Sequence, residues 1–150
     1  MDDNSKYRDL FFEETDEYVQ VLNDCLLQLE KDPQDKALID EIFRAAHTLK
    51  GMAATMGYQT MSELTHHMEN VLELFRNEAS MINSDIISLL FSCLDKLTEI
   101  VEDLREEKNT EFDISHLVNI LDDVAKGKDN QTLSSVVKES TIGLDRPVSD

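Results

Sequence analysis

The residues of this sequence with the greatest potential for chemistry are histidines, and His47 has suitable neighbours. Lys50 and Gly51 follow it by three and four positions, so a helix would place all three on one face. An imidazole is a nucleophile near neutral pH, a lysine one turn away can balance the charge of a phosphoryl group on the ring, and a glycine clears the approach of another protein. Glycine inside a helix costs about 1 kcal/mol relative to alanine, which favours a functional reason for it. His47 is therefore a candidate phosphoryl acceptor, although a surface histidine near a lysine is also a common pattern without function.

A second group of polar residues could orient this imidazole. His66 and Glu69 are three positions apart, so they are neighbours on one face of a following predicted helix. If the two helices are antiparallel around Gly57, His47 precedes the turn by 10 residues and Glu69 follows it by 12, which places them at similar heights. Glu69 could then accept a hydrogen bond from Nδ1–H of His47, fix the tautomer and leave Nε2 free to attack a phosphorus atom.

Other chemistries have weaker support. The sequence contains no glycine-rich phosphate loop and no GxSxG elbow, and its carboxylates are too dispersed to single out an acid/base pair. One of the adjacent His66 and His67 could bind a metal together with His47 and Glu69, but a di-metal bundle needs Glu-x-x-His from two helices and two further glutamates. We therefore expect no metal site and no cofactor, and we expect His116 to be an ordinary surface residue.

Composition narrows the class of partner. The chain has 150 residues, with 14 Lys and Arg against 32 Asp and Glu, which gives a formal net charge of −18. Such acidity argues against binding to nucleic acid or to an anionic membrane, and favours basic patches on protein partners. The N-terminus lacks the pattern of a signal peptide, and the longest uncharged apolar stretch, residues 86–94, is too short to span a membrane. A cytoplasmic protein is expected.

Apolar periodicity predicts an all-α fold. Four glycines and two prolines in the whole chain fit long helices with few turns. Apolar residues at steps of three and four predict helices over about residues 5–30, 33–56, 61–77, 85–106 and 113–125. In the first helix this stripe consists of Phe11, Thr15, Tyr18, Leu22, Cys25 and Leu29. Long helices with short links predict an antiparallel up-down four-helix bundle with an additional C-terminal fifth helix.

Smaller signals predict where the helices begin and end and what fills the core. Helices are expected to begin at Asp32 with Pro33, at Thr60 with Glu63 and at Ser84. Helices are expected to end at Gly57 and at Asn77. Cys25 and Cys93 are 68 residues apart and are predicted to be reduced, buried side chains. The methionines at 52, 56, 61, 68 and 81 are interpreted as core filler rather than as a binding groove.

The composition changes after Lys126. Residues 127–150 are rich in Ser, Thr, Asp and Lys, with a proline near the end. This stretch is typical of a linker or tail. The expected organisation is one domain over residues 1–126, followed by a linker toward the next domain of a longer parent chain.

Two runs of this sequence carry a family resemblance. Residues 43–51 (FRAAHTLKG) and 64–72 (LTHHMENVL), with support from residues 11–15 (FFEET) and 27–30 (LQLE), closely resemble the histidine phosphotransfer (HPt) domain at the N-terminus of the bacterial chemotaxis histidine kinases. The likeness covers about residues 5–125. The H-x-x-K-G motif occurs in HPt domains generally, and its combination with H-x-x-E and N-V-L is more specific to the chemotaxis kinases.

The resemblance implies a role for each matching residue. His47 matches the phosphorylated histidine, Lys50 the lysine beside it, and Gly51 the small residue that clears the approach. His66 and Glu69 match the supporting network, with Glu69 as the partner of the imidazole Nδ1. Thr48 matches a position where a small polar residue is usual.

The resemblance also implies partners. A separate ATP-binding kinase domain, which holds ATP and Mg²⁺, would phosphorylate this histidine, and the phosphoryl group would pass to an aspartate on response regulators of the chemotaxis regulator and methylesterase type. The parent protein would be a histidine kinase, while this fragment would be the phosphoryl carrier, with no ATP site, cofactor, nucleic acid or direct membrane contact. Two alternatives stay open: an HPt domain of another phosphorelay or hybrid kinase, and a non-catalytic acidic helical adaptor bundle.

Overall fold

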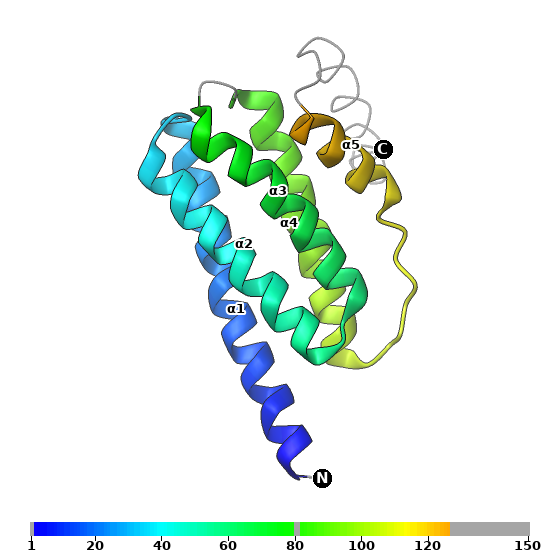
Figure 1. Ribbon diagram of the computed structural model, residues 1–150. Helices are drawn as coiled ribbons and strands as arrows, with labels where there is room; N and C mark the ends of the chain where they lie inside the picture. The colour runs from blue at the N-terminus through cyan, green and yellow to red at the C-terminus, as the bar shows by residue number, and fades with distance from the viewer. Residues whose placement is uncertain (1, 80–81, 127–150) are drawn as a thin grey trace, which may run out of the picture.

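The computed structural model describes residues 2–79 and 82–126 (Figure 1). Over these ranges the chain forms five helices and no strand: α1 (Asp2–Lys31), α2 (Lys36–Met56), α3 (Gln59–Asn77), α4 (Ser84–Glu106) and α5 (Ser115–Ala125). The prediction of an all-α fold with a fifth, C-terminal helix is confirmed. The predicted linker, residues 127–150, lies outside the described residues, so the proposed domain boundary stays a prediction.

The first four helices run alternately up and down and close into a bundle. α2 packs against α1 and α3, and α4 packs against α1 and α3, so that α1 and α3 lie on one diagonal. α5 adds to the outside of this bundle along α3, and α1 extends beyond the other helices at its N-terminal end (Figure 1). Among the described helices, none has enough uninterrupted apolar length to cross a lipid bilayer.

The apolar stripes face one another in a continuous core. Five of the six side chains in the predicted α1 stripe are buried, and Tyr18 is half buried. Both cysteines are buried and unpaired, as predicted. Burial, with a smaller contribution from Glu41, raises the pKa of Cys25 to about 11, and burial raises that of Cys93 to about 12. Neither thiol is a nucleophile at neutral pH, because each keeps its proton.

The predicted N-terminal caps of α2, α3 and α4 are wrong by one to three positions. α2 begins after Asp35 rather than Asp32, because the Asp35 carboxylate accepts hydrogen bonds from the amides of Ala37 and Leu38 at 3.0 and 3.2 Å. Pro33 instead lies in the turn that reverses the chain after α1. The link between α1 and α2 contains more than one aspartate that could act as the cap. The chain must also reverse direction within this link before α2 can start.

The starts of α3 and α4 differ in a similar way. Thr60 already lies inside α3, whose cap position is Tyr58 without a side-chain hydrogen bond, so the predicted capping box is absent. For α4 the cap is Asn83, whose Oδ1 accepts from the amide of Ile86 at 2.9 Å, and Ser84 is the first helical residue. The predicted end of α3 at Asn77 is confirmed.

The turn between α2 and α3 sets the register of the site. Gly57 ends α2 with φ of 77°, a left-handed conformation that glycine adopts without a steric penalty, and its amide donates to the carbonyls of Ala53 and Ala54. The ring of Tyr58 then packs edge-on against Phe11, with centroids 5.2 Å apart, which ties the turn to α1. Because only two residues link α2 and α3, positions equally far from the turn lie side by side.

Candidate functional site

His47 and Glu69 meet across the α2–α3 hairpin. Nδ1 of His47 lies 2.5 Å from Oε2 of Glu69, the contact that the antiparallel register predicts. The two side chains differ in their environment, since that of His47 is 59% exposed and that of Glu69 is 11% exposed. The orienting group is therefore fixed in the helix interface, while the group that it orients faces solvent.

This contact decides which ring nitrogen can act as a nucleophile. A carboxylate only accepts hydrogen bonds, so Nδ1 of His47 is the donor. In the neutral imidazole the other nitrogen, Nε2, then carries the lone pair. The arrangement presents a nucleophilic nitrogen to solvent with its partner nitrogen held in one protonation state.

Lys50 pairs with the second carboxylate oxygen of Glu69. Its Nζ lies 2.7 Å from Oε1 of Glu69. Partial burial alone would raise the pKa of Glu69, but hydrogen bonds from Lys50 and then from His47, together with their charges, outweigh burial and lower this pKa below its ordinary value. Glu69 is therefore ionised at neutral pH, and an ammonium stands one helical turn from the His47 ring.

Gly51 and Thr48 lie near His47 on α2. Gly51 is exposed, and a Cβ placed on it would meet no neighbouring atom within 4 Å. Packing within the described chain therefore does not require a glycine here, which leaves the approach of a partner as a reason for it. Thr48 is half buried and lines the same hollow as His47.

The other histidines lie apart from the His47–Glu69 contact. His66 is exposed on α3, where its ring centroid is 5.5 Å from that of His67 and where it borders a hollow with Lys50. Among the described residues, His66 makes no hydrogen bond to His47 or Glu69, so its supporting role stays a prediction. His67 instead contacts α5, with Nδ1 2.7 Å from Oδ1 of Asp122, an interaction that no sequence pattern indicated. His116 is exposed, as expected.

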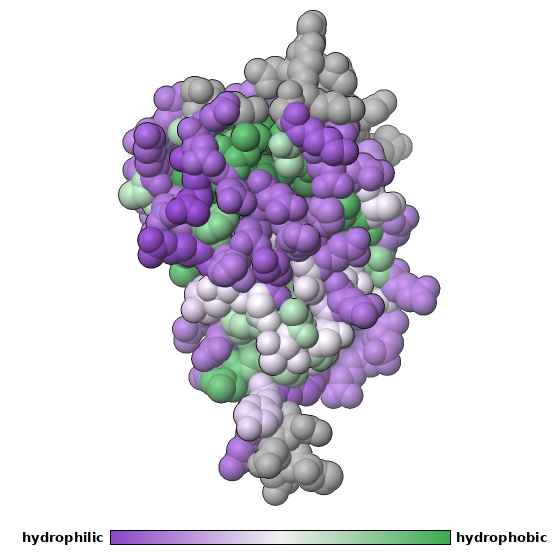
Figure 2. Space-filling model, in the orientation of Figure 1, coloured by the Kyte–Doolittle hydropathy of each residue, from purple (hydrophilic) through white to green (hydrophobic). Residues whose placement is uncertain are grey.

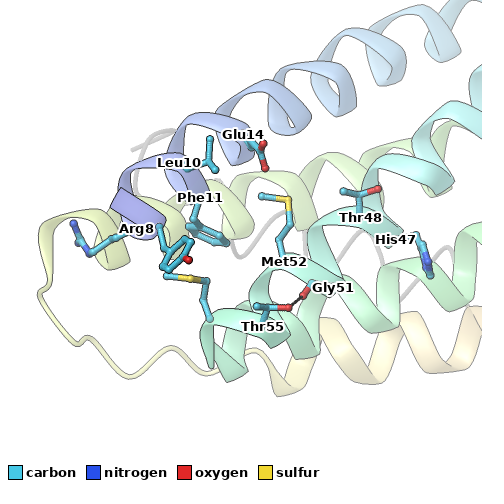
Figure 3. A pocket seen from close by; sticks show the side chains of 11 residues that line it. Arg8, Leu10, Phe11, Glu14, His47, Thr48, Gly51, Met52 and Thr55 are labelled. Carbon is cyan, nitrogen blue, oxygen red and sulfur yellow. Dashed lines mark hydrogen bonds between the residues drawn. The ribbon is translucent and has the colours of Figure 1, made fainter. Parts of the chain in front are cut away.

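A groove of about 910 Å³ runs from His47 along α1 and α2. Figure 3 shows His47 and Thr48 at one end and Arg8 near the other, with Phe11 and Met52 between them. The interpretation of the methionines as core filler is confirmed for the buried Met61 and Met68. Met52 and Met56 are partly buried, pack against the core and also line this groove. Met81 lies outside the described residues.

The surface around this groove is less hydrophilic than the region directly above it on the visible face (Figure 2). Figure 2 shows pale and green residues over the C-terminal half of α2 and the adjoining part of α1, below a strongly hydrophilic region. Tyr7 and Leu10 contribute to it and are 65% and 49% exposed. Exposed apolar side chains beside a nucleophile favour a protein as the molecule that approaches it.

Family comparisons agree with this geometry. The model of the family described as "Hpt domain" matches residues 6–107, which contain most of α1 and all of α2 to α4 and leave α5 outside. The chain is similar to the "Chemotaxis protein CheA" of Listeria monocytogenes, with 48% identity over 110 residues, 73% of this chain and 18% of that protein. It is also similar to that of Bacillus subtilis, with 46% identity over 120 residues, 80% of this chain and 18% of that protein. The chain thus spans about a fifth of the length of these relatives.

Solved structures give the same result. The solution structure of the histidine phosphotransfer domain of CheA has a TM-score of 0.70 and 42% identity, and the match covers 79% of this chain and 90% of that one. The CheA phosphotransferase domain from Thermotoga maritima has a TM-score of 0.61 and 48% identity, and the match covers 66% of this chain and 94% of that one. These comparisons do not favour a non-catalytic adaptor. The fold, the position of His47 on α2 and the family match lead to one assignment: the chain belongs to the Hpt domain family.

Proposed function

We propose that this chain is the phosphoryl carrier of a chemotaxis histidine kinase, with Nε2 of His47 as the atom that carries the phosphoryl group. The observation that supports this most directly is the asymmetry of the imidazole, whose Nδ1 is bound to the nearly buried Glu69 while the ring itself is 59% exposed. The CheA relatives and the Hpt family match support the same function.

The reaction has two balanced steps. In the first, the lone pair of Nε2 attacks the γ-phosphorus of ATP held by a separate kinase domain, the new N–P bond forms, and the bond to the leaving ADP oxygen breaks with its electron pair. In the second, a carboxylate oxygen of a response regulator attacks the phosphorus, and the N–P electron pair returns to Nε2. Both steps pass through a loose transition state with little bonding to the phosphoryl group, so positioning and charge dominate catalysis.

Glu69 and Lys50 supply these two effects. As Nε2 gives its lone pair, positive charge develops on the ring, and the Glu69 carboxylate stabilises this charge because Nδ1–H remains hydrogen-bonded to it. The Lys50 ammonium, one turn away, offsets the negative charge that arrives with the phosphoryl group. Gly51 leaves space for the partner's active site, and Thr48 lines the groove beside the ring.

The proposal includes specific partners. The donor is the ATP-binding kinase domain of the parent protein, which holds ATP and Mg²⁺, and the acceptors are response regulators of the chemotaxis regulator and methylesterase type. This domain needs no ATP site or cofactor of its own, and the relay operates in the cytoplasm. The net charge of −18 would speed association with basic edges on these partners.

Phosphorylation of matched variants tests the proposal. Wild-type chain, His47→Gln and His116→Gln are incubated with radiolabelled ATP, Mg²⁺ and a CheA kinase core that lacks its own Hpt domain. Wild type and His116→Gln should take up acid-labile phosphate, because His116 is exposed on α5 away from the site, and His47→Gln should take up none. Labelling of His47→Gln at the wild-type level would show that another residue is the acceptor.

A further inference from the structure

Phe43 lies beside the His47 ring and has no part in the mechanism described above. The two residues are one turn apart on α2, their ring centroids are 6.1 Å apart, and their planes differ by only 9°. Helical side chains lean toward the N-terminus of their helix, so the imidazole of His47 lies back over the turn that carries Phe43. The separation is within the range at which aromatic rings interact.

Phe43 is itself held by a cation from the neighbouring helix. The guanidinium carbon of Arg76 lies 4.3 Å from the centre of the Phe43 ring. Arg76 is fixed in turn by Asp40, with Nε 3.1 Å from Oδ1, and the other oxygen of Asp40 lies 2.9 Å from Nε of Arg44. The ring of Phe43 is therefore supported by a charged group that is anchored to α2 as well as to α3.

The two contacts of His47 come from one face of α3. Arg76 follows Glu69 by seven residues, which is about two helical turns, so both side chains point toward α2. Glu69 contacts the imidazole directly, and Arg76 contacts the ring that lies beside it. Residues of α3 thus contact His47 in two ways, directly through Glu69 and indirectly through Arg76 and Phe43.

We propose that Phe43 and Arg76 are positioning residues, which keep the plane of the His47 ring fixed while Glu69 fixes its Nδ1 atom. This inference rests on the proposed phosphotransfer through Nε2. A hydrogen bond at Nδ1 restrains that atom, but the rest of the ring can still tilt about the line from Nδ1 to Oε2. Packing restrains it little, because the side chain is 59% exposed.

The tilt matters because of where the lone pair lies. The lone pair of Nε2 is in the plane of the ring, and in-line attack requires that it point at phosphorus. Because the imidazole of His47 lies parallel to the Phe43 ring, its rotation toward Phe43 is restricted. Phe43 in turn needs support, since it is only half buried, and the guanidinium of Arg76 provides it.

Four variants test this inference, with His47→Gln included for reference. Phe43→Leu removes the flat ring and retains apolar volume, Phe43→Tyr keeps the ring as a rescue, and Arg76→Gln removes the cation. Arg105→Gln is the matched control, because the Arg105 guanidinium lies 5.0 Å from the centre of the Phe12 ring and pairs with Asp16 at 2.6 Å, the same kinds of contact on α4 and α1. Thermal unfolding checks that each variant is folded.

Two readouts separate positioning from docking and from stability. In phosphorylation by the CheA kinase core, Phe43→Leu should lower kcat about three- to tenfold with KM for the chain unchanged. Arg76→Gln should act in the same direction with a smaller effect, and Phe43→Tyr should recover most of the rate. Relaxation of the His47 ring carbons in NMR spectra should show greater ring motion in Phe43→Leu and Arg76→Gln, and unchanged motion in Arg105→Gln.

Three results would overturn the inference: a wild-type kcat and a rigid His47 ring in Phe43→Leu, a change in KM alone, or an equal effect of Arg105→Gln. Should Phe43→Leu fail to fold, kcat, KM and His47 ring motion in Arg76→Gln test the inference instead. This variant is suitable because the Arg76 side chain is exposed. Failure of the proposed function is a separate result, seen as label on His47→Gln. In that case ring motion still shows whether Phe43 and Arg76 hold the imidazole.

Discussion

The imidazole of His47 and the carboxylate of Glu69 are 22 residues apart in the chain and 2.5 Å apart in the structure. They belong to different helices that only two residues connect. The hairpin therefore brings the two groups together, with the imidazole on α2 and the carboxylate that contacts its Nδ1 on α3. Any change that shifts α2 along α3 by one turn, about 5.4 Å, would separate the pair.

Replacement of Glu69 by glutamine should slow phosphotransfer without unfolding the bundle. Glutamine keeps the volume and removes the charge, so the positive charge that develops on the ring is no longer stabilised and the tautomer is less firmly set. We expect a decrease in rate of about 10- to 100-fold, as for other carboxylates that orient a functional histidine. Rapid-quench measurement of label on the chain checks this, and thermal unfolding provides the control. An unchanged rate in a folded Glu69→Gln variant would remove Glu69 from the mechanism.

The same substitution should change how stability depends on pH. The folded protein holds the pKa of Glu69 below its ordinary value, because the contacts with Lys50 and His47 outweigh the effect of burial. A group whose pKa is lowered by folding stabilises the protein above its unfolded pKa, about 4.3, and loses this contribution as the pH falls through the folded value. The difference in free energy of unfolding between wild type and Glu69→Gln should thus be largest near pH 7.

Urea unfolding of wild type and Glu69→Gln at pH 7, 5 and 3 measures this difference. It should remain nearly constant from pH 7 to 5 and become smaller at pH 3. A difference that grows between pH 5 and pH 3 would mean that folding raises the pKa of Glu69, contrary to its contacts with Lys50 and His47.

The main contact of the site could be predicted from the sequence because few variables determine it. Apolar periodicity identifies the faces of α2 and α3, and Gly57 marks a tight turn, so the register that brings Glu69 to His47 follows by counting. The same reasoning says little about Phe43. Its ring orientation depends on the position of Arg76, which lies on another helix and is set by tertiary packing.

The attachment of α5 could not be predicted for a related reason. His67 meets Asp122 only because the segment after α4 returns the chain to α3. That segment contains two non-glycine residues with left-handed conformations, Glu107 and Asn109, with φ of 57° and 59°. Neither the path of such a loop nor the angle of the helix after it has a periodic signal in the sequence. The position of the α2 cap could not be predicted for a simpler reason, because Asp32 and Asp35 are chemically equivalent candidates.

A comparison of these two aspartates tests the corrected helix start. Asp35→Ala removes the acceptor for the amides of Ala37 and Leu38 and should lower the free energy of unfolding by about 1 kcal/mol. Asp32→Ala should have a smaller effect, because Asp32 lies before the turn and its side chain does not cap α2. Urea unfolding of both variants gives the two values. Equal losses, or a larger loss for Asp32→Ala, would contradict the cap seen here.

Substitutions at Gly51 distinguish a structural reason for this glycine from a functional one. A Cβ there meets no neighbouring atom within 4 Å, and the residue is inside α2, so Gly51→Ala should raise the free energy of unfolding by about 1 kcal/mol through its helix propensity. Gly51→Leu should also fold. A bulky side chain on the face that carries His47 should nevertheless hinder the partner's active site, so KM in phosphorylation by the kinase core should rise in Gly51→Leu more than in Gly51→Ala.

Ala54→Leu is the matched control for the effect of bulk on Gly51. Ala54 is likewise exposed on α2, and it is seven residues, or about two turns, after His47, so leucine there adds volume farther from the reacting ring. Steady-state phosphorylation over a range of chain concentrations gives KM for each variant. If Gly51→Leu matches Ala54→Leu in KM and in stability, the space in front of Gly51 does not serve the approach of the kinase.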